Sequence, residues 1–505
     1  MHRIVHSMVG ITLMALAILA VFQSTTHAEG PNAESLMWQL PNEKLRQPFE
    51  QRHPIYFVAK GTNPREWLNL KSFWNVAMEE AVNPKTGEKV TRKAVKIKVP
   101  LGLNSAPKVP LENEITVDRW VLGKKLYFDP ILSANNTVSC ASCHNPELGW
   151  TDQSPVSTGI GGAKGGVSSP PVFNSAYSPR QFWDGRAMSL EDQSQGPPGN
   201  PIEMAGKDPH PWKSVVLRIR KQPDYVEMFK KAYGTEPTRD GVAKAIATFE
   251  RTVLLGDSVY DRGPEELRAR AIKTRNFKAK LSPVDYESVL RKAIGNKEAG
   301  ILEAFGIQNK KDAERIPQIA ESIFNGQTLF FNKARCSKCH VGDNFTDNQF
   351  HNLGVGVVDG KIPANQMGRY AAEPTGHKNP EHVGAFKTPG LRGLLSTAPY
   401  MHDGSEKTLT EVVEFYNKGG NANRYLAPEM RDIAAEQKFL ENPKAWKGTD
   451  PRFGPDNVPI VPLKLNLTKQ EVADLVSFLK ALQGSPVNPY VADPNVYPPL
   501  ATAKK

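Results

Sequence analysis

The sequence predicts a mainly α-helical protein with two similar domains and an irregular N-terminal extension. The chain has 505 residues, which at about 150 residues per domain is enough for two or three domains. A short cysteine motif occurs twice, and each copy is flanked by stretches whose apolar residues recur at helical spacing. The chain has 39% hydrophobic residues, four cysteines and a mean hydropathy of −0.45. This composition excludes a polytopic membrane protein, a disulfide-rich scaffold and a disordered chain.

Residues 1–28 are predicted to be a secretory signal peptide. Arg3 precedes an apolar run at residues 11–22, and small residues at 26–28 end at Ala28, as a cleavage site requires. The run is short for a bilayer span, so a membrane anchor is the weaker alternative. We expect the mature protein to be exported to the periplasm without a membrane span.

The formal net charge is +11, which allows a basic surface to steer acidic partners. No compact Lys/Arg block or nucleic-acid motif accompanies this charge, so nucleic acid is not an expected partner.

All four cysteines belong to two copies of one pattern. The copies are Cys140, Cys143 and His144 in the first half, and Cys336, Cys339 and His340 in the second. Cys-x-x-Cys-His is the attachment motif of c-type haem, because the two thiols bond to one porphyrin and the adjacent imidazole reaches its iron. A redox dithiol or a four-thiolate zinc site needs no histidine after both pairs. The sequence therefore predicts two covalently bound c haems, with His144 and His340 as the proximal iron ligands.

Helical patterns flank both motifs. Residues 123–128 precede the first motif, residues 326–331 precede the second, and amphipathic stretches follow at 242–253 and 472–482. A helix leading into a haem site and a later helix packing against it form a cytochrome c arrangement. We expect cytochrome c-like domains at residues 116–257 (haem 1) and 318–484 (haem 2).

Three other segments have no assigned chemistry. Residues 29–115 show no clear period and are expected to be an irregular extension. Residues 258–317 are charged and helix-prone and are expected to be an insertion between the domains. Residues 485–505 contain five prolines and are expected to be an extended tail over the surface.

Residues 116–484 resemble the bacterial di-haem cytochrome c peroxidases and the MauG-type enzymes that oxidise tryptophan in a partner protein. The resemblance rests on both attachment motifs, on residues 181–187 with Gln193, Pro197 and Glu203, and on residues 386–392 and 397–404.

The resemblance implies roles for four residues of the first half. Glu203 matches the catalytic glutamate, and a carboxylate beside haem 1 can move a proton between the two oxygens of peroxide. Gln193 and Pro197 match positions that shape the same pocket. Trp183 matches an indole between the haems that relays electrons. Outside the motif, Glu203 would be a solvated loop carboxylate and Trp183 a packing residue.

One departure concerns haem 1. Many of the peroxidases carry a histidine that closes the iron until haem 2 is reduced, and Gly162 stands at that position here. No histidine occurs between His144 and His210. We expect an open or water-bound haem 1 in the oxidised protein, unless His210 folds back.

A second departure concerns haem 2. Thr408 and Glu411 form a predicted capping box that opens a helix, and this helix carries Tyr416. The peroxidases have an axial methionine here and MauG-type enzymes an axial tyrosine, which favours oxidised iron. Met401 and His402 are competing ligand candidates, and a core tyrosine is the alternative for Tyr416.

Calcium is implied more weakly. In the family, backbone oxygens at positions matching Thr397 and Pro399, with an asparagine side chain, hold an ion between the domains. Ser168 occupies the asparagine position, so water and carbonyl groups would have to complete the shell.

The leading functional hypothesis is a periplasmic peroxidase that reduces hydrogen peroxide to water with electrons from a small redox protein, a cytochrome c or a cupredoxin. The second is a MauG-type oxidase that takes electrons from aromatic side chains of a dedicated protein substrate. The third is an electron-transfer cytochrome. Glu203, Gln193 and the missing ligand of haem 1 argue against the third hypothesis.

Overall fold

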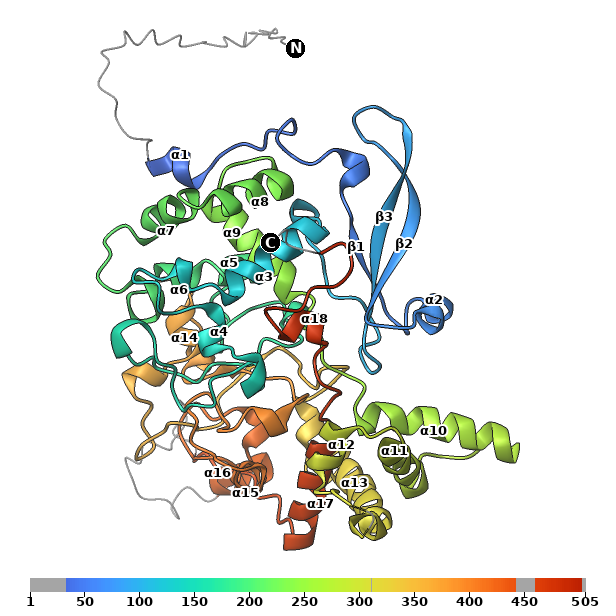
Figure 1. Cartoon of the computed structure of the whole chain (residues 1–505). Coiled ribbons are helices and arrows are strands. Elements are labelled where there is room, and N and C mark those ends of the chain that lie inside the picture. The colour runs from blue at the N-terminus through green and yellow to red at the C-terminus, as the bar shows by residue number, and fades with distance from the viewer. Residues whose placement is uncertain (1–32, 310, 442–458, 502–505) are drawn as a thin grey trace, which may run out of the picture.

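The computed structural model describes residues 33–309, 311–441 and 459–501 (Figure 1). The predicted signal peptide, residues 1–28, lies outside these ranges. No helix within them is long and apolar enough to cross a membrane.

The N-terminal extension contains a three-stranded sheet, so the prediction of an irregular segment is wrong for residues 55–98. The sheet has the order β1-β3-β2, with β1 parallel and β2 antiparallel to β3. Both faces of β2 mix apolar and charged residues, which hides the period of two that would indicate a strand. The elements of this region are α1 (Ala33–Met37), β1 (Ile55–Val58), α2 (Pro64–Asn69), β2 (Trp74–Val82) and β3 (Lys89–Lys98).

The predicted haem 1 region is built around the crossing of α3 and α9. Thr116 caps the start of α3 by accepting a hydrogen bond from the backbone N–H of Arg119. A Cβ atom on Gly123 would overlap the carbonyl group of Ala245 in α9, so only glycine allows the two backbones this close. The helices are α3 (Val117–Phe128), α4 (Cys140–Cys143), α5 (Leu190–Gln193), α6 (Gly196–Gly199), α7 (Pro211–Arg220), α8 (Pro223–Tyr233) and α9 (Arg239–Glu250).

The predicted haem 2 region repeats this crossing with α13 and α17. A Cβ atom on Gly326 would overlap the carbonyl group of Asp474 in α17. The elements are α13 (Ile316–Phe331), β4 (Phe350–His351), α14 (Arg369–Ala372), β5 (Phe386–Lys387), α15 (Leu409–Asn417), α16 (Ile433–Glu441) and α17 (Lys469–Ala481). The capping box of Thr408 and Glu411 opens α15 as predicted.

One phenylalanine holds each crossing together. The ring of Phe249 in α9 lies 5.0 Å from that of Tyr127 and 6.0 Å from that of Phe128, measured between centroids. The ring of Phe478 in α17 lies 5.1 and 6.3 Å from the equivalent rings of α13. The two regions therefore repeat their cores as well as their motifs.

Residues 258–317 form helices whose apolar cluster also includes Ala320 and Ile323 of α13 and Ala481 of α17. Figure 1 shows α10 and α11 beside α13, at the edge of the molecule. The helices are α10 (Val259–Thr274), α11 (Pro283–Gly295) and α12 (Ala299–Ala304).

The C-terminal tail packs into the haem 1 region, so the expectation of an extended surface segment is wrong for its described part. It contains α18 (Pro489–Ala492), and Val491 and Ala501 are fully buried. The ammonium group of Lys124 in α3 donates hydrogen bonds to the carbonyl groups of Tyr490 and Val496, both 2.7 Å long. Proline content predicts an extended backbone but does not predict whether that backbone is buried.

Candidate functional site: two cysteine-histidine motifs bridged by Trp183

The histidines of both motifs are oriented by backbone carbonyl groups. Nδ1 of His340 lies 2.8 Å from the carbonyl oxygen of Phe345, and Nδ1 of His144 lies 3.4 Å from that of Trp150. Burial lowers the pKa of both imidazoles, so both are neutral near pH 7. A neutral imidazole with Nδ1 bound to a carbonyl group presents Nε2 to a metal.

All four cysteines are unpaired. Burial raises the pKa of Cys143 to about 11 and that of Cys336 and Cys339 to about 12, and it raises the pKa of Cys140 further. These sulfur atoms lie where an uncharged form is favoured. They therefore suit the uncharged thioether of an attached haem better than the thiolates of a zinc site or a reactive dithiol.

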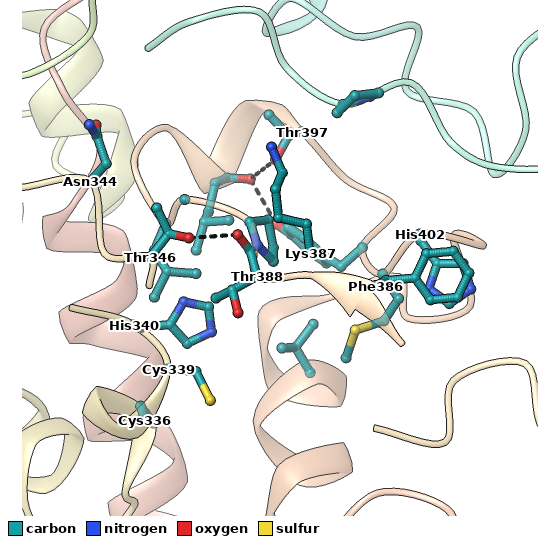
Figure 2. A pocket seen from close by; sticks show the side chains of 18 of the residues that line it. Cys336, Cys339, His340, Asn344, Thr346, Phe386, Lys387, Thr388, Thr397 and His402 are labelled. Carbon is teal, nitrogen blue, oxygen red and sulfur yellow. Dashed lines mark hydrogen bonds between the residues drawn. The ribbon is translucent and has the colours of Figure 1, made fainter. Parts of the chain in front are cut away.

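A cavity of about 550 Å³ adjoins the second motif (Figure 2). Cys336, Cys339 and His340 lie on its wall, and α15 contributes Leu409, Val412, Val413 and Tyr416. This volume is within the range of about 300–1,000 Å³ that is common for cofactor pockets. The cavity thus combines two half-buried thiols, a neutral imidazole and an apolar wall, which fits a haem.

Tyr416 and Met401 both line this cavity. Burial raises the pKa of the Tyr416 hydroxyl, and the nearby Cys339 and Cys336 add to the shift. His402 is already engaged: its ring stacks on Phe386 at 3.5 Å between centroids, and its Nε2 lies 2.6 Å from Oε1 of Gln366. These contacts disfavour His402 as an iron ligand and leave Tyr416 and Met401 as candidates.

Glu203 lies in a single π-helical turn, residues Pro201–Ala205. Such turns are frequent at functional sites. Nδ2 of Asn200 donates a hydrogen bond of 2.7 Å to Oε1 of Glu203. Burial raises the pKa of Glu203, opposed by the charge of Arg186 and by this hydrogen bond. Burial is also the main cause of the raised pKa of Cys140 and Cys143, and the charge of Glu203 adds to it in both. The carboxylate is thus electrostatically coupled to the first motif.

Four other residues were singled out around the first motif, and the structure places them as follows. Gln193 is the last residue of α5, Pro197 lies in α6, and both are half-buried. Gly162 is exposed, and a Cβ atom there would meet no atom within 4 Å. His210 is exposed at the start of α7.

Trp183 connects the two motifs. Its indole Nε1 donates a hydrogen bond of 2.9 Å to the carbonyl group of Ser168. The next residue, Ser169, donates from its hydroxyl to the carbonyl group of Cys143 at 2.7 Å. On its other side, Trp183 lines the cavity of the second motif, and its ring centroid lies 6.3 Å from that of His402. The indole thus reaches the first motif through Ser168 and Ser169, and it lies on the wall of the cavity that the second motif also lines.

Comparison with known proteins identifies the family. A sequence model described as di-haem cytochrome c peroxidase matches residues 118–266. Methylamine utilization protein MauG of Methylorubrum extorquens is 34% identical over 345 residues, covering 66% of this chain and 81% of that protein. The chain belongs to the di-haem cytochrome c peroxidase and MauG family.

Two further proteins show how far the similarity extends. Cytochrome-c peroxidase IdrP1 of Denitromonas iodatirespirans is 32% identical to this chain. The alignment covers 80% of this chain and 92% of that protein. The crystal structure of a MauG-like protein associated with microbial copper homeostasis is 28% identical with a TM-score of 0.56, covering 77% of this chain and 97% of that one. Members of this family are haem oxidoreductases, and both its peroxidases and its MauG proteins are similar to this chain.

The three residues that the family resemblance connects with calcium line one cavity, namely Ser168, Thr397 and Pro399. The Ser168 hydroxyl donates to the carbonyl group of Met401 at 3.2 Å, and its N–H donates to that of His402 at 2.7 Å. The serine thus joins the two halves directly by hydrogen bonds. Calcium binding stays a prediction.

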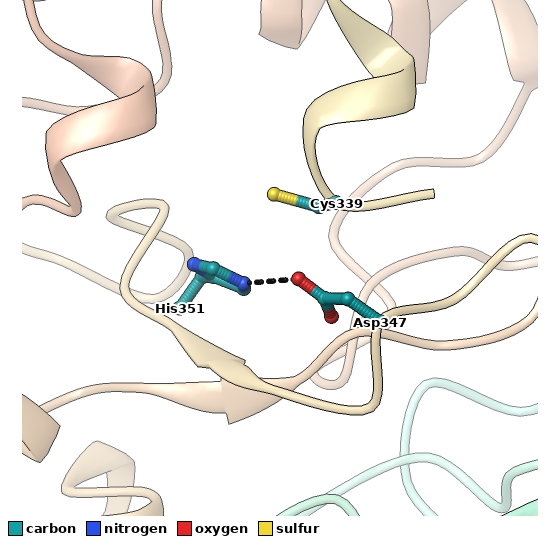
Figure 3. A group of neighbouring side chains, drawn as sticks. All are labelled: Cys339, Asp347 and His351. Carbon is teal, nitrogen blue, oxygen red and sulfur yellow. Dashed lines mark hydrogen bonds and ion pairs between the residues drawn. The ribbon is translucent and has the colours of Figure 1, made fainter. Parts of the chain in front are cut away.

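A second group of metal-ligand types involves Cys339, Asp347 and His351 (Figure 3). Their ligand atoms lie within 4.8 Å of one another, and Nε2 of His351 lies 2.9 Å from Oδ2 of Asp347. The sequence predicts that Cys339 bonds to haem, and that bond would leave only Asp347 and His351 as metal ligands in this group. We interpret Asp347 and His351 as a polar pair beside the cavity.

Sequence reasoning missed two residues of the first site. Ser169 contacts His144 as well as Cys143, with its hydroxyl 3.1 Å from Nδ1. Glu250 is buried at the end of α9, burial raises its pKa to about 8, and its charge acts on Cys140. A charged residue directly after the buried Phe249 was the available signal for Glu250, since buried carboxyl groups are rare.

Proposed function

We propose that the protein is a di-haem c-type peroxidase that reduces hydrogen peroxide to water at haem 1, with electrons relayed inward from haem 2. Haem 1 is held by Cys140, Cys143 and His144, and haem 2 by Cys336, Cys339 and His340. The enzyme is exported to the periplasm, where a cytochrome c or a cupredoxin supplies the electrons.

The observation that carries this proposal is the half-buried carboxylate of Glu203 beside the first motif. A pure electron carrier has no use for a carboxylate whose pKa is raised by burial next to its haem. A peroxidase needs one, because cleavage of the O–O bond requires a proton on the departing oxygen.

The residues divide the chemistry as follows. A haem held by Cys140, Cys143 and His144 would supply the redox-active iron and the electrons needed to cleave the O–O bond. Glu203 takes the proton from the near oxygen and delivers it to the far oxygen. Asn200 holds the carboxylate through its 2.7 Å hydrogen bond. Two electrons and two protons then balance the conversion of one peroxide into two waters, and Trp183 lies on the route of the electrons.

A MauG-type oxidase is the second candidate. The observation that favours it is Tyr416 in the wall of the second cavity, because an oxygen ligand favours oxidised iron at haem 2. The electrons would then come from aromatic side chains of a dedicated protein substrate. We retain calcium at Ser168, Thr397 and Pro399 as part of either candidate.

The test is to mix fully oxidised protein with hydrogen peroxide without reductant and to record haem absorption by stopped flow. A fast spectral change in the wild type, absent in Glu203→Gln, supports an open haem 1 served by Glu203. A reaction that begins only after one electron is added means that a sixth ligand closes haem 1. Turnover with a reduced cytochrome c or cupredoxin separates the peroxidase from the MauG-type oxidase.

A further inference from the structure

The loop that carries Trp183 belongs to the haem 1 half but is held by side chains of the haem 2 half. Lys387 in β5 makes three of the contacts. Its backbone N–H donates to the carbonyl group of Trp183 at 2.8 Å. Its ammonium group donates to the hydroxyl of Ser178 at 2.6 Å and to the carbonyl group of Arg180 at 2.7 Å. The start and the middle of the loop are thus bound to one residue.

Arg369 in α14 holds the other end of this loop. One guanidinium nitrogen, Nη1, donates to the carbonyl groups of Asp184 at 3.2 Å and Gly185 at 2.9 Å. The guanidinium also lies 5.1 Å from the ring of Phe350, and a Cβ atom on Gly185 would overlap that ring. The loop therefore fits closely against the haem 2 half.

These contacts hold the Trp183 indole between the haem 1 half and the haem 2 half. The Trp183 ring donates to Ser168 on the haem 1 side, while Lys387 and Arg369 hold its backbone on the haem 2 side. Figure 2 shows Lys387 next to Phe386, the other residue of β5, and the Phe386 ring lies beside His402. A rotation of the loop would move the indole relative to both motifs.

We propose that Lys387 and Arg369 are positioning residues that clamp residues 178–185 and thereby set the place of Trp183 between the haems. The inference rests on the proposed function, in which peroxide is the oxidant and one electron at a time passes from haem 2 to haem 1. Neither residue touches peroxide, and both act through the loop.

The experiment compares holoprotein variants Lys387→Met and Arg369→Met with the wild type. Lys292→Met is the matched control, because it also removes one positive charge but breaks only an exposed pair with Glu266. Three quantities are measured: the rate at which pre-reduced haem 2 is oxidised after peroxide is added, the rate at which fully oxidised protein reacts with peroxide, and amide hydrogen exchange of residues 178–187.

We expect oxidation of haem 2 to slow by about 10- to 100-fold in both variants, since small displacements in a reacting array cost this much. The reaction of oxidised protein with peroxide and the haem spectra should keep their wild-type values, and exchange of residues 178–187 should accelerate. Lys292→Met should match the wild type in all three. Ser178→Ala removes one of the two acceptors of the Lys387 ammonium group, together with the bonds that the Ser178 hydroxyl donates to Arg180 and Asn348. It should give a smaller effect of the same kind, which covers the case that a stronger variant does not fold.

Unchanged exchange of residues 178–187 would overturn the clamp, and so would an equal slowing of both haem reactions. A wild type that does not react with peroxide would contradict the proposed function instead. In that case the exchange measurement still decides whether Lys387 and Arg369 hold the loop.

Discussion

Glu203 combines a half-buried carboxyl group with a hydrogen-bond donor from Asn200 and the charge of Arg186. Burial outweighs the other two, so its pKa lies above the ordinary 4.5. The base must be ionised to accept a proton, so activity should fall as the pH falls through this raised pKa. We expect the acidic limb of the profile of kcat/KM for peroxide to have its midpoint above 4.5.

Glu203→Gln should remove that acidic limb and lower kcat/KM by about 10²- to 10⁴-fold, the usual share of general acid-base catalysis. Both haems should stay attached, which the absorption spectrum checks. Glu112→Gln, on the surface, is the control and should retain full activity. Normal turnover by Glu203→Gln would remove this residue from the proposed role.

Tyr416 gives a prediction about the second site that does not depend on turnover. Replacing an oxygen ligand by a thioether raises the potential of a haem, so Tyr416→Met should shift the potential of haem 2 upward and leave haem 1 unchanged. A spectroelectrochemical titration measures both. Tyr425→Met, on the same half but outside the cavity, should cause no shift. If Tyr416→Met also leaves the titration unchanged, Tyr416 is not the ligand and Met401 becomes the candidate.

At the scale of residues, the sequence predicts where the two motifs lie but not which residues contact them. The two cysteine motifs are local patterns, and the structure brings one histidine and two half-buried thiols together at each. The partners that orient them are not local: Lys387 lies 204 positions after Trp183 in the chain and contacts it only in the folded protein. Asn200 was within reach of sequence reasoning, since Asn before Pro often caps a turn.

At the scale of elements, one glycine at each of the two helix crossings allows the paired helices to approach closely. Gly123→Ala and Gly326→Ala should each lower the free energy of unfolding by about 1–3 kcal/mol, because the added methyl group overpacks a helix contact. Thermal denaturation followed by circular dichroism measures the loss.

Gly295→Ala is the same substitution at an open position, and we expect it to raise the free energy of unfolding instead of lowering it. Gly295 is the last residue of α11, and a Cβ atom there would meet nothing within 4 Å. Alanine has the higher helix propensity, so this variant should gain up to about 1 kcal/mol. Equal effects at all three positions would mean that the crossings are not limited by backbone contact.

Helices and strands of this chain differ in how well the sequence predicts them. The apolar spacing of α3, α9, α15 and α17 is visible in the sequence, although α3 and α9 are buried on nearly all sides and only α15 and α17 keep an exposed face. The strands β2 and β3 escaped prediction because only part of the sheet is covered: Trp74 is buried, whereas Val76 and Met78 on the same face are exposed. A period of two needs one consistently buried face.

At the scale of the whole molecule, the two ends of the described chain meet at the haem 1 core. The Trp74 indole of the N-terminal sheet donates to the carbonyl group of Pro499 at 3.1 Å, and its ring centroid lies 5.2 Å from that of Trp120 in α3. Such contacts join residues 425 positions apart, so no local pattern of the sequence predicts them.

Lys124 is the main polar link between this core and the C-terminal tail. Its side chain is fully buried, and its ammonium group lies 4.3 Å from the ring centroid of Tyr497. Lys124→Met would leave the carbonyl groups of Tyr490 and Val496 without their donor. The two hydrogen bonds to a charged group are worth about 1.5–3 kcal/mol each, and methionine avoids part of the cost of burying an ammonium group. The free energy of unfolding should therefore fall by about 2–4 kcal/mol.

Lys125→Met is the control for this prediction. The neighbouring lysine forms an exposed ion pair with Asp224 at 3.3 Å, and such pairs contribute about 0–1 kcal/mol. Urea denaturation followed by tryptophan fluorescence compares the two variants, and limited proteolysis should release the tail from Lys124→Met first. If both variants unfold at the same urea concentration, apolar burial of Val491 and Ala501 holds the tail without Lys124. In that case the buried ammonium group would add little to the closure of the fold.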